Sequence, residues 1–119
     1  MMIRFEQVAR IALALPGVEE STTNGSLAFR VRGKLFLHLW DDGDTLVIRI
    51  GREEKQVLLS ADPDRFFVNR AHATSPAILT RLSDNGSGDL DELAELIEDA
   101  WRRCAPKALV RARDEHADG

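Results

Sequence analysis

Residues 27–50 read LAFRVRGKLFLHLWDDGDTLVIRI, and this stretch decides the fold. Bulky apolar residues alternate with smaller or basic ones in residues 27–32, and residues 46–50 repeat the pattern. Such alternation is typical of half-buried strands, because successive strand side chains point to opposite faces of a sheet. Two short turns, Gly33-Lys34 and an acidic Asp-Gly turn, separate these runs from a middle strand at residues 35–40. The stretch therefore predicts a three-strand antiparallel meander.

The segments on either side predict helices and two more short strands. Apolar residues recur at helical spacing in residues 3–15, 52–60 and 89–104. The apolar runs at residues 66–68 and 78–82 are strand candidates, whereas residues 21–25 and 69–76 lack periodicity and are predicted loops. A capping-box pattern at residues 89–92 marks the start of the last helix. Because strands with one apolar face need cover, we predict an α+β fold, an antiparallel sheet (three-strand meander plus two short strands) with helices packed on one face.

The length and the cysteine content set the domain organisation and the compartment. The 119 residues, of which 44% are hydrophobic, suffice for one domain with its own core. We assign that domain to residues 1–113 and expect a frayed C-terminal tail at residues 114–119. Cys104 is the only cysteine, which excludes an intramolecular disulfide and a four-cysteine zinc site and fits a cytoplasmic protein. No stretch approaches the ~20 apolar residues of a membrane span, so we expect no membrane partner.

The net charge of −4 excludes a strongly basic protein that coats nucleic acid regardless of sequence. The charge is unevenly distributed, however. Residues 26–82 carry 9 basic and 7 acidic side chains, whereas residues 83–119 carry 5 basic and 10 acidic ones. The predicted sheet region is therefore slightly basic, which leaves local binding of an anion open.

Basic side chains on the predicted meander are the first candidates for a binding site. If Leu27, Phe29 and Val31 face the core, Arg30 and Arg32 point to the open face, because strand side chains alternate. Lys34 lies beside them at the first hairpin. Cations on an open sheet face suit contacts with phosphates. An ordinary solvated sheet face remains the alternative, since any half-exposed strand shows alternating arginines.

Aromatic and loop residues extend this predicted surface. By alternation, Phe36, His38 and Trp40 share one face of the second strand, where an aromatic beside arginines suits a stacked base. The loop at residues 69–76, and Arg65 before it, would add cations. The alternatives are a mobile surface loop whose histidine has no binding role, and a solvated sheet face with Trp40 partly buried under a loop. The candidate nucleic-acid-binding residues are Arg30, Arg32, Lys34, His38, Trp40, Arg49, Arg70 and His72.

Catalytic, metal and cofactor sites find little support in the sequence. It contains no nucleophile elbow, phosphate-binding glycine loop or His-x-x-x-His helix. The acidic residues 41–44 lack the spaced ligands and distal glutamate of a calcium loop, so we interpret them as a hairpin turn. Trp101 and Cys104 lie on the apolar stripe of the last helix, where we expect a core indole and a buried thiol. We therefore predict a protein that is not an enzyme and has no metal or cofactor.

Several segments, in their order along the chain, resemble the MmcQ/YjbR-like family. They are LALPGVEES (residues 13–21), FRVRGKLF (29–36), residues 46–59, DPDRFFV (62–68), DELAELIEDAW (91–101) and APK (105–107). The resemblance spans residues 5–110 and implies a CyaY-like α+β fold and a DNA-binding role attributed to a "double wing" arrangement. In the family, the segment after residues 67–68 usually carries an aromatic near a histidine. Here residues 69–76 keep His72 without an aromatic, and the chain contains no tyrosine.

Two hypotheses for the function follow from these patterns. The first is a cytoplasmic DNA-binding module that uses the basic sheet face and binds weakly and with strong salt dependence. The second is a non-enzymatic domain whose open sheet face binds a protein, a small ligand or a second copy of itself. An apolar patch around Phe36 and Trp40 would favour a protein partner, and a positive potential would favour nucleic acid.

Overall fold

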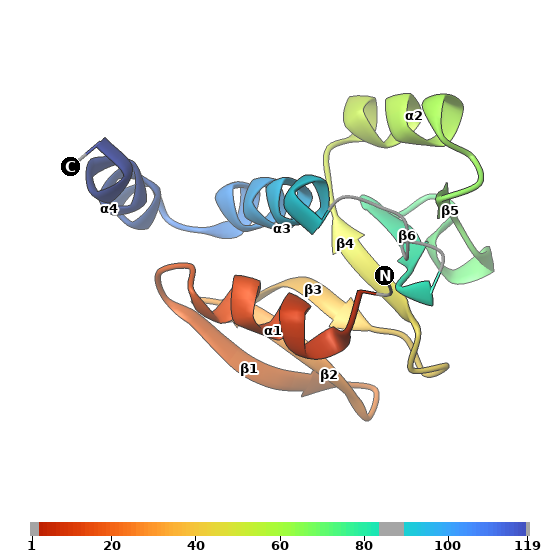
Figure 1. The fold of residues 1–119 in the computed structure, drawn as a ribbon, viewed down its shortest axis with the longest axis horizontal. Coiled ribbons are helices and arrows are strands. Elements are labelled where there is room, and N and C mark those ends of the chain that lie inside the picture. Colours follow the sequence, from red (N-terminus) through yellow and green to blue (C-terminus); the bar gives the residue numbers. More distant parts are fainter. Residues whose placement is uncertain (1–2, 84–89, 119) are drawn as a thin grey trace.

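The computed structural model describes residues 3–83 and 90–118, with side chains described to residue 115 (Figure 1). The strands are β1 (Val18–Thr23), β2 (Ser26–Val31), β3 (Lys34–Leu39), β4 (Thr45–Arg49), β5 (Phe66–Phe67) and β6 (Ala77–Arg81). The helices are α1 (Phe5–Leu13), α2 (Arg52–Ala61), α3 (Leu90–Cys104) and α4 (Lys107–Asp118), with a short 3₁₀ helix η1 (Arg70–His72). Each helix and strand predicted between residues 27 and 104 has a counterpart. The predicted capping residue Asp89 lies outside the described residues.

The six strands form one antiparallel sheet in the order β1-β2-β3-β4-β6-β5. Within it, β2, β3 and β4 are the predicted meander, and β6 joins it beside β4. Helices α1 and α3 contact each other and cover one face of the sheet (Figure 1). The predicted α+β fold with helices on one face is therefore confirmed. Among the described residues, no helix has the length and apolar character needed to cross a membrane.

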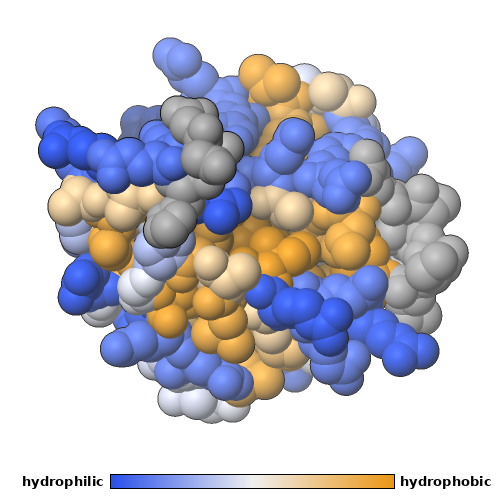
Figure 2. All heavy atoms as spheres, turned by 60° about the vertical axis from the view of Figure 1, so that its left-hand side comes forward, coloured by the Kyte–Doolittle hydropathy of each residue, from blue (hydrophilic) through white to orange (hydrophobic). Residues whose placement is uncertain are grey.

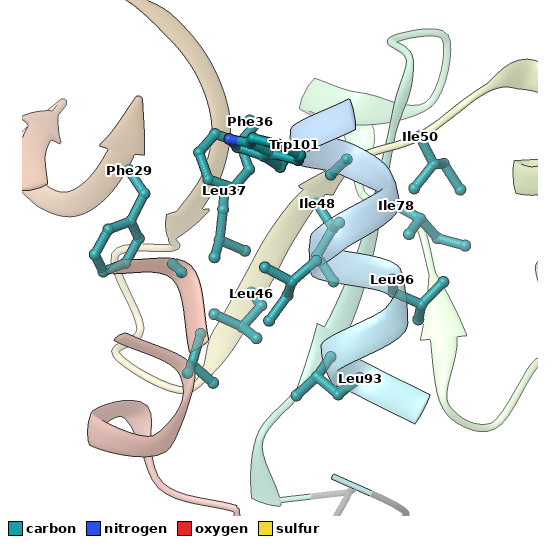
Figure 3. Packing of buried hydrophobic residues seen from close by; sticks show 14 of the residues in the cluster. Phe29, Phe36, Leu37, Leu46, Ile48, Ile50, Ile78, Leu93, Leu96 and Trp101 are labelled. Carbon is teal, nitrogen blue, oxygen red and sulfur yellow. The ribbon is translucent and has the colours of Figure 1, made fainter. Parts of the chain in front are cut away.

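The core lies between these two helices and the sheet. Trp101 of α3 is fully buried in the same core cluster as Phe36 (Figure 3), and Cys104 is buried one turn later, both as predicted. The indole Nε1 of Trp101 donates a hydrogen bond of 2.9 Å to the carbonyl oxygen of Pro16. This bond ties α3 to the turn that follows α1, so the two covering helices are held in one arrangement.

The prediction of a loop at residues 21–25 is wrong, because β1 extends through Thr23. β1 is an edge strand in which every residue after Val18 is polar, so no apolar alternation marks it in the sequence. Its threonines still favour extended backbone, since they are β-branched. Asn24 and Gly25 both have positive φ, 49° and 82°, as the two central residues of a tight hairpin turn require.

The second hairpin turns at Arg32-Gly33, one residue earlier than predicted. Arg32 has φ 52° and Gly33 has φ 84°, again the pair of positive values that suits a two-residue hairpin. Arg32 therefore leaves the strand and lies exposed at the hairpin tip. The expectation that it shares the sheet face with Arg30 is wrong for this reason.

A β-bulge changes which face Phe36 occupies. Phe29 pairs with Leu37, but the next residue, Arg30, pairs with Leu35, so Phe36 is the extra residue in β3. Both Phe36 and Leu37 therefore reach the core, and Phe36 is only 1% exposed. The expectation that Phe36 shares a face with His38 is wrong, because the bulge resets the alternation.

Helix α4 packs against the end of α3 and continues past Arg113 to Asp118. Arg102 of α3 holds Asp114 with a 2.7 Å ion pair, and Arg113 holds Glu98 with one of 3.0 Å. Figure 2, turned toward the α4 side, shows hydrophobic residues on the surface between hydrophilic ones. The last helix is thus joined to the domain by ion pairs as well as by apolar contact.

Candidate functional site

The sheet face opposite α1 and α3 has its own small apolar cluster. His38 on β3 is in register with Val47 on β4, which is in register with Leu79 on β6. Val47 and Leu79 are buried in this second cluster, and Trp40 and Phe67 pack against it. His38 is therefore only 9% exposed although it lies on the face away from the main core.

The loop after η1 is fastened by a buried lysine. Lys55 of α2 is 5% exposed, and its Nζ donates to the carbonyl oxygen of Ser75 at 2.6 Å. The same ammonium donates to the carbonyl oxygens of His72 at 3.0 Å and Ala73 at 3.4 Å. Asn69 Oδ1 also accepts a hydrogen bond of 2.9 Å from the backbone N–H of His72. These bonds hold His72 in place. A mobile surface loop was the alternative that the sequence allowed for this segment.

Three rings meet on this face. The ring centroids of His38 and Trp40 are 6.5 Å apart, and those of His38 and His72 are 6.1 Å apart. Trp40 and His72 meet edge to face at 5.5 Å and 73°. The structure thus brings together a histidine and a tryptophan from β3 and its end with a histidine from the loop. We call His38, Trp40 and His72 the ring cluster.

The surroundings of both histidines disfavour their protonated forms. Burial lowers the pKa of His38, and the positive charges of His72 and Arg30 lower it further, against a hydrogen bond to Leu39 that raises it. Burial also lowers the pKa of His72, with a further contribution from the charge of Lys55. The 3.4 Å contact of His38 Nδ1 with the Leu39 carbonyl oxygen assigns the proton to Nδ1, because a carbonyl only accepts. His72 Nδ1 is 2.9 Å from Ser75 Oγ.

Two shallow pockets adjoin at His38. We call the first the indole pocket; it has a volume of about 200 Å³ and is lined by Thr23, Asn24, Ser26, His38, Leu39, Trp40 and Asp41. We call the second the arginine pocket; it has a volume of about 160 Å³ and is lined by Leu35, Phe36, His38, Val47, Arg49, His72, Ser75, Pro76 and Ala77. Drug-sized ligands need pockets of roughly 300–1,000 Å³. Each pocket therefore suits one small group rather than a whole ligand of that size.

Two of the predicted arginines lie near the ring cluster. Arg49 is an exposed residue that lines the arginine pocket. Arg30 acts electrostatically on His38 and donates hydrogen bonds to Ser21 Oγ at 3.3 Å and to the Gly33 carbonyl oxygen at 3.4 Å. Arg70 lies exposed on η1, two residues before His72.

The other expected cations lie elsewhere. Arg32 is at the hairpin tip, and Lys34 at the start of β3 pairs with Val31 of the main core, which places Lys34 on the other face of the sheet. Arg65 forms ion pairs with Asp62 at 3.3 Å and Glu92 at 3.2 Å, which place it near the start of α3. The structure thus narrows the predicted basic surface to the part beside the rings.

Sequence reasoning missed Lys55 and Ser75. A lysine in a charged amphipathic helix is ordinarily solvated. Only the helical spacing of Lys55 to Leu58 and Leu59 indicates that it lies on the inner face of α2. Ser75 lay in a segment without periodicity, so no pattern pointed to its contact with His72. Both depend on how the loop folds back onto the sheet.

The acidic turn at residues 41–44 is a hairpin turn, as predicted. Asp42 Oδ1 accepts hydrogen bonds of 2.9 Å from the backbone N–H groups of Asp44 and Thr45, and Oδ2 accepts one of 2.6 Å from Thr45 Oγ1. Asp44 in turn accepts from Ser83 Oγ at 2.6 Å. Within residues 3–83 and 90–118, no group of three or more His, Cys, Asp or Glu side chains could hold a metal ion.

Comparison with known proteins matches most of the chain to one family. A family model described as YjbR matches residues 13–103. The chain is 38% identical over 71 residues to "Uncharacterized protein Rv2570" of Mycobacterium tuberculosis and to "Uncharacterized protein Mb2600" of Mycobacterium bovis. Each match covers 59% of this chain and 53% of the relative, so the chain spans about half the length of these relatives.

A solved structure has the same fold. The crystal structure of Deinococcus radiodurans protein DR2400, which has a domain described as DUF419, superposes with a TM-score of 0.68. The match covers 84% of this chain and 77% of that chain at 18% sequence identity. At that identity the likeness concerns the fold alone.

Proposed function

The chain belongs to the YjbR family, and from that premise we propose that it is a DNA-binding module that uses the face of its sheet carrying the ring cluster. The observation that carries the proposal is the meeting of His38, Trp40 and His72 beside Arg49, with the charge of Arg30 acting on His38. Guanidinium groups contact phosphate oxygens, and aromatic rings stack with bases. A face with both kinds of group suits nucleic acid better than it suits a simple anion.

Unpaired DNA fits this face better than a duplex does. Base stacking on a protein ring requires a base that is not already stacked between its neighbours. The ring cluster lies on a sheet surface next to shallow pockets, and no described element projects from it like a helix that enters a groove. We therefore expect single-stranded DNA to bind more tightly than a duplex of the same length. The net charge of −4 keeps the affinity modest and strongly dependent on salt.

We propose binding without catalysis at this face. Among the described residues, the pair most like a nucleophile and its base is Ser75 and His72, whose Oγ and Nδ1 are hydrogen-bonded. Among the residues that the structure describes, no carboxylate bonds to His72 to orient its ring. The same local bond has a structural use, because it closes the turn that the buried lysine holds.

The test is an anisotropy titration of labelled single-stranded and duplex oligonucleotides at low and moderate salt. The double variant Arg30→Gln/Arg49→Gln should weaken binding and reduce the salt slope by about 0.7 for each single-strand phosphate that the protein no longer neutralises. The matched control is Arg10→Gln/Arg111→Gln, which removes the same charge from exposed positions on α1 and α4. No binding at low salt, or an equal loss of affinity in both double variants, would overturn the proposal.

The second candidate function is the binding of a protein at the open sheet face. One observation weighs against the apolar patch of Phe36 and Trp40 that was expected for this function. Phe36 is buried in the main core, so it does not form an exposed apolar patch with Trp40. Trp40 itself is half-buried against the second cluster. Light scattering at increasing concentration tests self-association. A dimer that Trp40→Leu dissociates would favour this candidate over DNA binding.

A further inference from the structure

The two pockets beside the ring cluster differ in chemistry although they adjoin at one residue. His38 lines both of them. The indole pocket extends from it along Trp40 toward the turn between β1 and β2, and the arginine pocket extends the other way toward Arg49. A ligand that fills both therefore spans His38 and presents a different group on each side.

The indole pocket suits a flat group with polar edges. Trp40 supplies an aromatic surface, and its indole N–H makes no hydrogen bond within the described part of the chain. Asn24 and Ser26 supply an amide and a hydroxyl at the rim, and Asp41 supplies a carboxylate. Donors and acceptors around an aromatic wall are what a nucleobase contacts when it is read outside a helix.

The arginine pocket suits a compact anion. Arg49 is its cation, and Ser75 and two histidines supply polar groups. None of the residues that line it is acidic. Arg49 forms no ion pair with any residue that the structure describes, so a ligand anion would not compete with a carboxylate of the protein.

We propose that the two pockets together hold one nucleotide of a single strand, with its base against Trp40 and its phosphate beside Arg49. This inference rests on the proposed DNA-binding function and adds the unit that is recognised. The charges fix the orientation: Asp41 repels a phosphate from the indole pocket, and Arg49 attracts it to the other. The small volumes agree, because each pocket takes one part of a nucleotide and neither takes the whole.

The free nucleotide and the strand have the same chemistry, and so the experiment includes both. Tryptophan fluorescence is followed while thymidine monophosphate, a ten-nucleotide thymidine strand and an abasic strand of equal length and charge are added. Trp101 is fully buried, so a ligand-dependent signal is assigned to Trp40. The base-bearing strand should quench this signal and should bind roughly ten-fold more tightly than the abasic strand, the usual size of one stacked base.

Variants separate the two halves of the nucleotide. Because a substitution at Trp40 removes the fluorescent reporter, isothermal titration calorimetry measures the affinity for all three ligands in the parent and in every variant. Trp40→Leu keeps apolar contact with the second cluster but removes the ring, so it should abolish the ten-fold advantage and leave the abasic strand unaffected. Trp40→Phe keeps a ring and should restore most of the advantage. Arg49→Gln should weaken both strands by the same factor, because both carry the phosphate.

The outcomes distinguish this inference from the proposed function. If both strands bind equally and Trp40→Leu changes neither, the nucleotide subsite is overturned, although DNA binding stands. If no strand binds but the monophosphate quenches Trp40 in the parent, and Trp40→Leu abolishes its binding, the subsite holds a free nucleotide and the proposed DNA-binding function falls. If none of the three ligands binds, both are overturned.

Discussion

Lys55 Nζ lies 2.6 Å from the carbonyl oxygen of Ser75 and so joins helix α2 to the loop that carries His72. The lysine is 5% exposed, and three backbone carbonyl oxygens accept its hydrogen bonds. Backbone carbonyls of a loop usually face water, and here they solvate a buried cation instead. The position of His72 over the sheet therefore depends on a residue from another element.

Replacement of Lys55 by methionine tests this dependence. Methionine keeps the apolar stem but donates nothing to the three carbonyl groups, so we expect the free energy of unfolding to fall by about 2 kcal/mol in urea denaturation. The loop should also loosen, which hydrogen exchange at residues 72–75 would detect. Lys107→Met is the matched control, because Lys107 is exposed at the start of α4 and should change neither measurement. Equal effects of the two variants would show that the carbonyl contacts do not hold the loop.

We expect acid to destabilise the fold because of the two histidines in the ring cluster. The pKa values of His38 and His72 are lowered in the folded protein, mainly by burial, from a value near 6.5 in the unfolded chain. The unfolded chain therefore binds protons that the folded protein does not, and the free energy of unfolding falls as the pH drops through about 6.5 toward the folded pKa values. Urea denaturation between pH 7.5 and pH 5.5 measures this slope.

Glutamine at both histidines removes the titrating groups while it keeps polar side chains. His38→Gln/His72→Gln should therefore flatten the dependence of stability on pH in this range. The charges of Arg30 and Lys55 act on the two histidines, and Arg49 and Asp41 line the pockets beside them; the double variant leaves all four side chains in place. An unchanged slope in the double variant would assign the acid sensitivity to other residues.

Local patterns in the sequence were enough to predict the fold class and most strands. Alternation marks β2, β3 and β4 because their apolar residues face a core, and helical spacing marks α3 for the same reason. The edge strand β1 has no such alternation, since all of its residues after Val18 are polar. The bulge at Phe36 is also invisible, because register depends on how two strands pair and not on one strand alone.

The candidate site could be predicted only in part. Alternation places His38 and Trp40 on one face, and the resemblance draws attention to His72. Their meeting requires the loop to fold back under Lys55, which is a long-range contact between residues far apart in the chain. The early turn at Arg32 removes one predicted cation from the site for a purely local reason, its positive φ.

The close approach of α4 to Gly17 should make the stability of the fold sensitive to substitution at this position. Gly17 has φ 73°, and a Cβ there would lie 2.7 Å from Leu109 Cδ1 of α4. Gly33 also has positive φ, 84°, but a Cβ would meet nothing within 4 Å. The left-handed backbone should cost both alanine variants about 1 kcal/mol, and we expect the close approach to Leu109 to cost Gly17→Ala about 1 kcal/mol more.

A third variant checks the source of this excess. Leu109→Ala removes the atom that the new Cβ would meet, so the extra cost of Gly17→Ala should shrink in the Leu109→Ala background. Thermal unfolding of the four proteins in the cycle gives the coupling. Additive effects would indicate that α4 can move away from Gly17 at no cost.

We expect the carboxylate of Asp42 to stabilise the hairpin turn that follows Trp40. Its carboxylate accepts from two backbone N–H groups at 2.9 Å and from Thr45 Oγ1 at 2.6 Å. Burial raises the pKa of Asp42, but these hydrogen bonds outweigh it and hold the pKa below its usual value. Asp42→Asn puts an amide in place of one acceptor oxygen, and we expect the free energy of unfolding to fall by about 1 kcal/mol.

The neighbouring acid supplies the control for that change. Asp41→Asn makes the same change of charge one residue away, at an exposed side chain that takes no part in the turn's hydrogen bonds. Its stability at pH 7 should match the parent in urea denaturation. The cost of Asp42→Asn should also disappear as the pH falls through the folded pKa of Asp42, because the parent then loses the same charged acceptor. A cost that persists there would mean that the shape of the side chain, and not its charge, stabilises the turn.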